Sequence, residues 1–324
     1  MKRKIGLLAA VFVCAAVSAQ TPSAQKVLCT TPETTCRRLS SFCMDGDGNF
    51  AAADMAQKQI KIIRADDTLK ASFDLPFAPQ VIGWWAERKV YVVAGGADLA
   101  VLTSDGRILK PGDAELGNLK IFAASGTSVQ TPITSPSPSA AVKKSASKSE
   151  RVTVPYASAI SASGDHVFVT RRAGSGFSIF RYDAKLENPQ EIITGLRGCC
   201  GQMDAMAADG VIYVCENTRF RIARYTFEGK PLPALDKPAG VTWWVGCCEP
   251  KNVFLSADRK TLYVAESGQC AVNRFSLSGS HLGEVGRISD IGGCVRVTVA
   301  ASADGKSVYM LDTNKNTIRI LTSK

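Results

Sequence analysis

Apolar and polar positions alternate along most of the chain in short runs that end at turn residues. Six of these runs carry an aromatic residue at a matching place, namely Phe50, Tyr91, Phe168, Tyr213, Tyr263 and Tyr309. The runs around Tyr213 and Tyr263 are VIYV and TLYV, and each is followed by a polar loop and a second alternating segment, RIARY or AVNRF. Turn pairs such as Asp209-Gly210 precede the aromatic runs. The pattern predicts short antiparallel strands joined by tight turns, repeated six times.

The repeat length points to an architecture. Successive aromatic positions are 41, 77, 45, 50 and 46 residues apart, and the longest interval contains the segment 126–150, GTSVQTPITSPSPSAAVKKSASKSE. Ser, Pro, Ala and Lys dominate this segment, so we expect it to be a disordered insert. Without it, each unit has room for one four-stranded sheet. Sheets of this kind bury their faces by stacking radially, so the sequence predicts an all-β fold, a six-bladed β-propeller.

The two ends of the chain are expected to meet in one sheet. The last unit stops after its third strand, TIRILTS from Thr317, and its fourth strand is missing. A β-prone piece, Lys26–Cys29, lies near the other end. We therefore expect the ring to be closed by an N-terminal strand. Cys29, Cys36 and Cys43 lie in this region, and a disulfide here would fasten the seam.

The repeats resemble a known family. VIYVCENTRFRIARYTFEGK and TLYVAESGQCAVNRFSLSG are similar to NHL repeats, in which a Tyr-Val-acidic strand, a polar loop and an Arg-flanked strand recur. The resemblance covers all six units and implies an NHL/TolB-like propeller. It implies no single activity, because this fold serves binding proteins, lyases, lactonases and sensors. The paired cysteines also resemble those of a group of exported bacterial NHL-type proteins.

The first residues predict export. Residues 2–4 are Lys-Arg-Lys, residues 5–17 are apolar, and residues 17–19 are small at the cleavage positions. This is the pattern of a cleavable signal peptide at 1–19, which leaves residues 20–324 as a single domain in the periplasm or outside the cell. A lipid anchor at Cys14 is the less favoured alternative. No other segment has the length and apolarity of a transmembrane helix.

Charge adds little to the prediction of a partner. The net charge is +10, but the basic residues are scattered among the repeats. Nucleic-acid binding would require basic residues clustered with aromatic ones, so we expect no nucleic-acid partner. The expected ligand is an unidentified protein or small molecule.

Cysteines recur at one position of the repeat. Cys199-Cys200 opens one unit, Cys247-Cys248 opens the next, and Cys294 opens the last. Cys36 matches Cys247 in the first unit. These positions are expected to start the innermost strand of each blade, where the strands converge at the channel mouth. The sequence therefore predicts a cluster of sulfurs near one end of the channel.

The chemistry of this cluster stays open between three interpretations. Adjacent cysteines do not easily bond to each other, because their Cα atoms lie about 3.8 Å apart and strand side chains alternate between faces. Disulfides between blades, or simple burial of small side chains, form the favoured interpretation. Binding of copper or zinc by thiolates is the second, and thiol-based redox exchange is the third. The chain contains no CxxC or CxxCH motif to support thioredoxin-like chemistry or a covalent haem.

Other candidate chemistry is sparse. His166 and His281 are the only histidines, and neither lies near a candidate nucleophile in sequence. Acidic residues recur three positions after the aromatic residues at Glu216, Glu266 and Asp312, with Asp54 one place off. They predict either a calcium site, as in sugar-lactonase propellers, or hydrogen bonds that shape a blade loop, and their repetition favours the loop role.

Two further features remain. Asp204 and Asn252 occupy matched positions four residues after each Cys-Cys pair and are expected to face the channel, although two ligands do not make a metal site. One tryptophan of each doublet, Trp84-Trp85 and Trp243-Trp244, is expected to pack between blades, which is favoured over a ligand platform. The sequence as a whole favours a non-enzymatic binding or scaffold module. The alternatives are a metal-dependent lactonase or hydrolase and a thiol-based redox partner.

Overall fold

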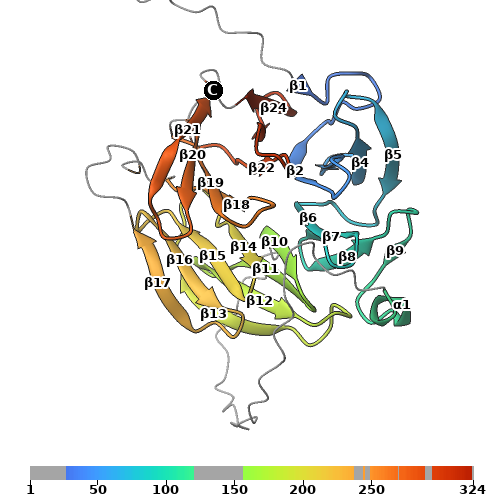
Figure 1. Ribbon diagram of the computed structural model, residues 1–324. Coiled ribbons are helices and arrows are strands. Elements are labelled where there is room, and N and C mark those ends of the chain that lie inside the picture. The colour runs from blue at the N-terminus through green and yellow to red at the C-terminus, as the bar shows by residue number, and fades with distance from the viewer. Residues whose placement is uncertain are drawn as a thin grey trace, which may run out of the picture.

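Six four-stranded antiparallel sheets surround a central axis in the computed structural model (Figure 1). The structure describes residues 27–119, 156–236, 244, 249–268, 270–288 and 294–322. The expected signal peptide at 1–19, the expected insert at 126–150, and Cys247 and Cys248 lie outside these residues. The all-β, six-bladed architecture predicted from the repeats is confirmed.

Each blade runs from an inner strand at the channel to an outer strand at the rim. The strands of the first blade are β2 (Leu39–Met44), β3 (Phe50–Asp54), β4 (Gln59–Ile63) and β5 (Leu69–Asp74). Those of the second are β6 (Val81–Trp85), β7 (Val90–Gly95), β8 (Asp98–Leu102) and β9 (Ile108–Leu109), followed by the short helix α1 (Ala114–Gly117). Those of the third are β10 (Ala157–Ser163), β11 (His166–Ala173), β12 (Gly176–Tyr182) and β13 (Gln190–Leu196).

The second half of the ring follows the same order. The strands of the fourth blade are β14 (Ala205–Ala208), β15 (Val211–Glu216), β16 (Arg221–Thr226) and β17 (Pro231–Asp236). Those of the fifth are β18 (Asn252–Leu255), β19 (Thr261–Glu266), β20 (Ala271–Ser276) and β21 (His281–Arg287). Those of the sixth are β22 (Val299–Ala301), β23 (Ser307–Asp312), β24 (Thr317–Thr322) and the N-terminal strand β1 (Val27–Leu28).

The N-terminal strand closes the ring, as the missing fourth strand of the last repeat predicted. Val27 pairs with Arg319 and Leu28 with Ile318 in antiparallel register. Leu28 is fully buried in a core cluster that joins the first and last blades. This seam rests on only two paired residues, whereas β23 and β24 pair over six.

The repeated aromatic residues lie on the second strand of each blade and pack in the layers between neighbouring blades. Phe50 of the first blade meets Tyr309 of the last with ring centroids 4.6 Å apart. Burying such a side chain contributes about 2–3 kcal/mol each. The aromatic residues of the other blades are buried in the corresponding clusters, which explains why the aromatic position recurs in the sequence.

Side chains of one blade bind the free edge of the next inner strand. An inner strand pairs with a neighbouring strand on one edge only. The N–H groups on its other edge, which faces the channel, therefore need other hydrogen-bond acceptors. The Asp204 carboxylate accepts a hydrogen bond from Val253 N at 2.9 Å, and Asn252 Oδ1 accepts one from Val299 N at 2.7 Å. Ser161 Oγ accepts one from the amide of the following blade at 3.0 Å. These bonds fix the inner strands relative to one another around the channel.

Candidate functional site: the channel pocket

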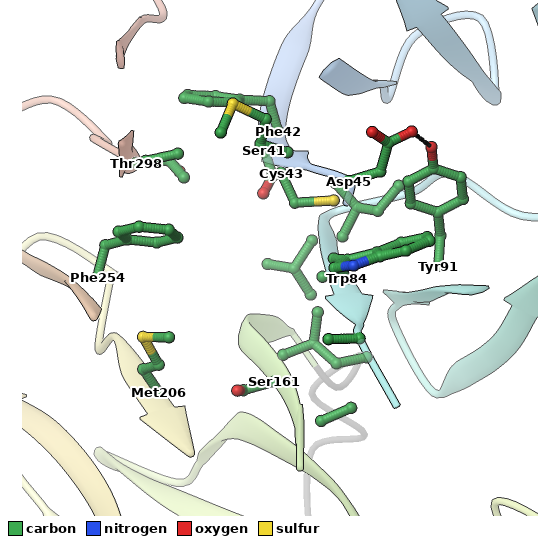
Figure 2. A pocket seen from close by; sticks show the side chains of 18 of the residues that line it. Ser41, Phe42, Cys43, Asp45, Trp84, Tyr91, Ser161, Met206, Phe254 and Thr298 are labelled. Atoms are coloured by element: carbon green, nitrogen blue, oxygen red, sulfur yellow. Dashed lines mark hydrogen bonds between the residues drawn. The ribbon is translucent and has the colours of Figure 1, made fainter. Parts of the chain in front are cut away.

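A cavity of about 830 Å³ lies in the channel and is lined by the inner strands of all six blades (Figure 2). Its volume is in the range of small-molecule sites. The residues of its wall fall into rows. In each blade, one residue of the inner strand pairs with the repeated aromatic residue of the second strand, and these equivalent residues define one row.

The first row, which we call the collar, consists of the six residues paired in register with the repeated aromatic residues. Its members are Met44, Trp84, Ser161, Met206, Phe254 and Ala300. All six line the cavity. Four of them are large and apolar, and these four are half-buried, so part of each side chain faces open space. Figure 2 shows Trp84, Met206 and Phe254 arranged around the cavity from different strands.

The second row lies two residues before the collar in each blade. Four of its residues lie on the inner strands and therefore on the same face as the collar, and the other two directly precede β14 and β22. Its members are Phe42, Ile82, Ala159, Asp204, Asn252 and Thr298, and all line the cavity. The first three, from blades one to three, form an apolar arc. The last three, from blades four to six, form a polar arc. The pocket is therefore two-sided at this level.

Asp204 is the ionisable group of the polar arc. Burial raises its pKa to about 6, against the opposing influence of the Val253 amide, the Arg296 guanidinium and Asn252. Arg296 also lines the cavity and donates to the Tyr156 hydroxyl at 2.6 Å. The arc can thus present a carboxyl group whose charge changes near neutral pH, together with a fixed cation.

The two tryptophans of the first doublet have different roles. Trp85 is fully buried, donates from Nε1 to Gly164 O at 2.9 Å, and lies under the Arg88 guanidinium. Trp84 faces the cavity and packs against Tyr91 with centroids 4.9 Å apart. The prediction that one tryptophan packs between blades is confirmed for this doublet, and its partner lines the pocket. Of the second doublet, Trp244 is buried, and Trp243 lies outside the described residues.

The recurring acidic residues take part in hydrogen bonds that shape the loops. Asp54 accepts the backbone N–H groups of Arg37 and Arg38, and Asp312 Oδ1 accepts those of Asn314 and Lys315 at 3.0 Å each. Such contacts agree with the loop role favoured from the repetition.

The other two recurring acidic residues, Glu216 and Glu266, bind side chains. Glu216 pairs with Arg221 at 2.6 Å, and Glu266 accepts from Trp244 Nε1 at 2.8 Å. No lining residue of the cavity belongs to this set of four acids.

Neither histidine lies in the cavity wall. His166 packs beside Phe168 and Phe227, and burial lowers its pKa. His281 Nε2 lies 3.0 Å from Asn273 Oδ1 on the outer part of the fifth blade, and burial lowers its pKa as well. The pocket therefore offers no imidazole for acid–base chemistry.

The first cysteine pair lies in a turn and not at the start of a strand as expected. Cys200 has φ of 55°, a left-handed conformation that a strand does not contain, and β14 begins only at Ala205. As a result the side chains do not alternate between two faces, and the sulfurs of Cys199 and Cys200 lie 3.3 Å apart. Cys200 and Cys294 are exposed.

Cys36 lies elsewhere, in the buried core of the seam. Among the residues that the structure describes, no three His, Cys, Asp or Glu side chains are placed to hold one metal ion. Convergence of the sulfurs of Cys199, Cys200, Cys247, Cys248 and Cys294 at the channel mouth stays a prediction, because Cys247 and Cys248 lie outside the description.

Comparison with known proteins gives the fold and no more. No family model matches the chain, and no curated protein matches it. Among solved structures, a catalytically inactive virginiamycin B lyase from Staphylococcus aureus with quinupristin is 15% identical, with a TM-score of 0.55, over 88% of this chain and 80% of that chain. The calcium-binding protein regucalcin from Agrobacterium tumefaciens is 10% identical, with a TM-score of 0.58, over 92% and 93%. At these identities the similarity shows a shared propeller architecture.

No described helix is long and apolar enough to cross a membrane.

Proposed function

We propose that this protein is a binding module of NHL type whose channel pocket takes a small molecule, or a side chain of a partner, that carries an apolar or aromatic group. The observation that carries the proposal is the collar, in which Met44, Trp84, Met206 and Phe254 face a cavity of about 830 Å³. Half-buried aromatic and thioether side chains around a preformed cavity are typical of ligand sites.

The polar arc sets the orientation of the ligand. The apolar portion packs on the collar. A polar group of the ligand then faces Asp204, Thr298 and the Arg296 guanidinium. A ligand with one apolar end and one polar end fits both halves of the wall.

A direct test uses N-phenyl-1-naphthylamine, a neutral aromatic probe whose fluorescence rises in apolar surroundings. Saturable binding to the wild-type protein is expected, with energy transfer from Trp84. Trp84→Ala and Phe254→Ala should each weaken binding roughly tenfold, because each removes about 1–2 kcal/mol of apolar contact.

The control is Phe220→Ala, which removes an exposed aromatic side chain from a loop outside the cavity wall. Its affinity should equal that of the wild type, and all variants should remain fully folded at the temperature of the binding assay. Non-saturable binding, or equal affinity in Trp84→Ala and Phe220→Ala, would sink the proposal.

Binding of a soft metal by the cysteines is the second candidate. It is supported by the 3.3 Å separation of the Cys199 and Cys200 sulfurs, which suits capture of one thiophilic ion by both. Protein matured with copper and zinc available should then contain one of these metals and lose it on mild acidification, because thiolates must be deprotonated to bind. Protein that carries neither metal and has no titratable thiol would exclude this candidate in favour of disulfides.

Export of the chain belongs to the same proposal. The apolar segment at 5–17, preceded by basic residues, supports cleavage after Ala19 and a place in the periplasm or outside the cell. Sequencing of the N-terminus of the secreted protein should begin at Gln20. A retained leader in the cytoplasm would contradict export without affecting the binding site.

A further inference from the structure

The segment that joins β1 to β2 holds the ring closed. It covers residues 29–38, and its first eight residues, from Cys29 to Cys36, have the sequence CTTPETTC. β1 itself contributes only two residue pairs to the last blade. A two-residue pairing frays easily, so the closure depends on how firmly the following segment is held.

Two thiols meet inside this segment. Cys29 and Cys36 are each 2% exposed and belong to the same core cluster as Leu28 and Phe42. The Cys29 thiol lies against Cys36, whose own Sγ donates to Thr34 O at 3.7 Å, and both cysteines are free thiols. This contact, together with burial, raises the pKa of Cys29 well above its usual value. The two sulfurs are therefore neighbours in the closed ring.

Buried charged residues of the first blade hold the backbone around the thiols. Asp67 accepts from Cys29 N at 2.7 Å and from Thr30 N at 3.0 Å. Lys61 donates from Nζ to Thr35 O at 2.6 Å. Because these bonds use backbone atoms and not sulfur, the segment keeps its shape whether or not the sulfurs are bonded.

The third cysteine of this region is placed differently. Cys43 is half-buried and lines the channel pocket, beside Asp45 (Figure 2). Burial and the Asp45 carboxylate raise its pKa. The three cysteines are equally spaced in the sequence, but in the structure Cys29 and Cys36 are neighbours and Cys43 is separate from them.

We propose that Cys29 and Cys36 are a disulfide-forming pair that locks the ring closure. The oxidant is a disulfide, either of a small molecule or of a protein. One thiol of the pair, as thiolate, attacks the oxidant and releases one thiol; the second then attacks the mixed disulfide and releases another. A Cys29–Cys36 S–S bond forms, the oxidant's S–S bond is reduced to two thiols, and these take the two protons.

Burial sets the order of events. The thiolate is the reactive form, and the closed ring keeps these thiols protonated and away from solvent. Oxidation therefore takes place while β1 is undocked, during folding or during opening of the seam. After docking, the same burial protects the disulfide from reductant.

The test refolds the full chain in a glutathione redox buffer and, separately, with a reductant. Remaining thiols are alkylated in acid, and the crosslinked peptides are mapped by mass spectrometry. The oxidised protein should contain a Cys29–Cys36 crosslink. Closing this eight-residue loop should raise the melting temperature by roughly 5 °C relative to the open form.

Two variants isolate this bond from any others. In the double variant Cys29→Ala/Cys36→Ala, the difference in melting temperature between oxidised and reduced protein should shrink by roughly 5 °C. In Cys215→Ala, which removes an equally buried cysteine of the fourth blade, the difference should stay as in the wild type. Alkylation of both Cys29 and Cys36 in the oxidised wild type, or a crosslink from either to another cysteine, would overturn the proposal. Peptide mapping of the wild type decides this even if the double variant does not fold.

Discussion

The apolar and polar arcs of the channel occupy equivalent positions in different blades, yet they carry opposite chemistry. Phe42, Ile82 and Ala159 face the channel from blades one to three, and their equivalents in blades four to six are polar. The backbone is repeated around the ring, so the difference lies only in the side chains. A scaffold with six similar units can therefore hold an asymmetric site.

Part of this polarity serves the scaffold. Asp204 and Asn252 each accept a backbone N–H of the next inner strand, at 2.9 Å and 2.7 Å. In the apolar half of the ring, a residue outside the second row accepts the backbone N–H of the next inner strand. Gln80 Oε1 accepts from Ala157 N at 2.8 Å. Polar residues at the channel are therefore not sufficient evidence of ligand chemistry, and the two roles have to be separated by substitution.

The largest effect is expected on the apolar arc. Phe42→Ala should lower the free energy of unfolding by about 3–5 kcal/mol, because the ring is 1% exposed and packs among core residues of the seam. Phe254→Ala, in the half-buried collar, should cost clearly less. Urea denaturation measures both. Equal losses would show that the apolar arc is no better packed than the collar.

Asp204 should make stability depend on pH. Its folded pKa of about 6 exceeds the unfolded value of 3.8, so the native state binds more protons between these values. The free energy of unfolding should therefore fall as pH rises from about 4 to about 6, by about 2–3 kcal/mol in total from this group. Denaturation at several pH values should show that Asp204→Asn flattens this fall.

The control for that experiment is Asp304→Asn, which changes an acid in an exposed turn and should leave the fall in place. An unchanged slope in Asp204→Asn would mean that Asp204 is ionised throughout this range in the folded protein.

The sequence predicted the ring but only part of the site. Six aromatic repeats and a missing last strand were sufficient for the blades and the seam, because strand period and turn residues are local properties. The collar was missed, since Trp84, Met206 and Phe254 look like ordinary core residues until pairing places them opposite the aromatic residues. Aligning the inner strands on those residues would have revealed the row.

The cysteines show a different limit of sequence reasoning. Alignment placed Cys199 and Cys200 at a strand start, whereas the left-handed backbone at Cys200 makes a turn. Contact between Cys29 and Cys36 depends on a loop held by Asp67, a residue nearly forty positions away. The spacing of the cysteines in the sequence does not show hydrogen bonds to residues so far along the chain.

Ser161 tests the bonds between blades at the collar. Ser161→Ala removes the acceptor of the Ala207 N–H and leaves this partly buried donor unpaired. The expected loss of unfolding free energy is about 1 kcal/mol, measured by urea denaturation. Ser302→Ala, which removes the acceptor of the Ser307 N–H within a turn of the last blade, provides a comparison in which no bond between blades is lost. A loss in Ser161→Ala no greater than the experimental error would mean that the inner strands are held by apolar packing alone.

The smallest effect is expected from exchanging one side chain between the two arcs. Thr298 is half-buried, lines the cavity, and makes no side-chain hydrogen bond within the part of the chain that the structure describes. Thr298→Val keeps its shape and replaces a hydroxyl by a methyl group, so unfolding free energy should change by less than about 0.5 kcal/mol. Affinity for N-phenyl-1-naphthylamine should rise up to about threefold, since the wall gains apolar surface. The mirror change Ala159→Ser should lower that affinity by a similar factor. Two changes of the same sign would show that this probe does not sense the polarity of the second row, and the apolar group of the natural ligand would then be assigned to the collar alone.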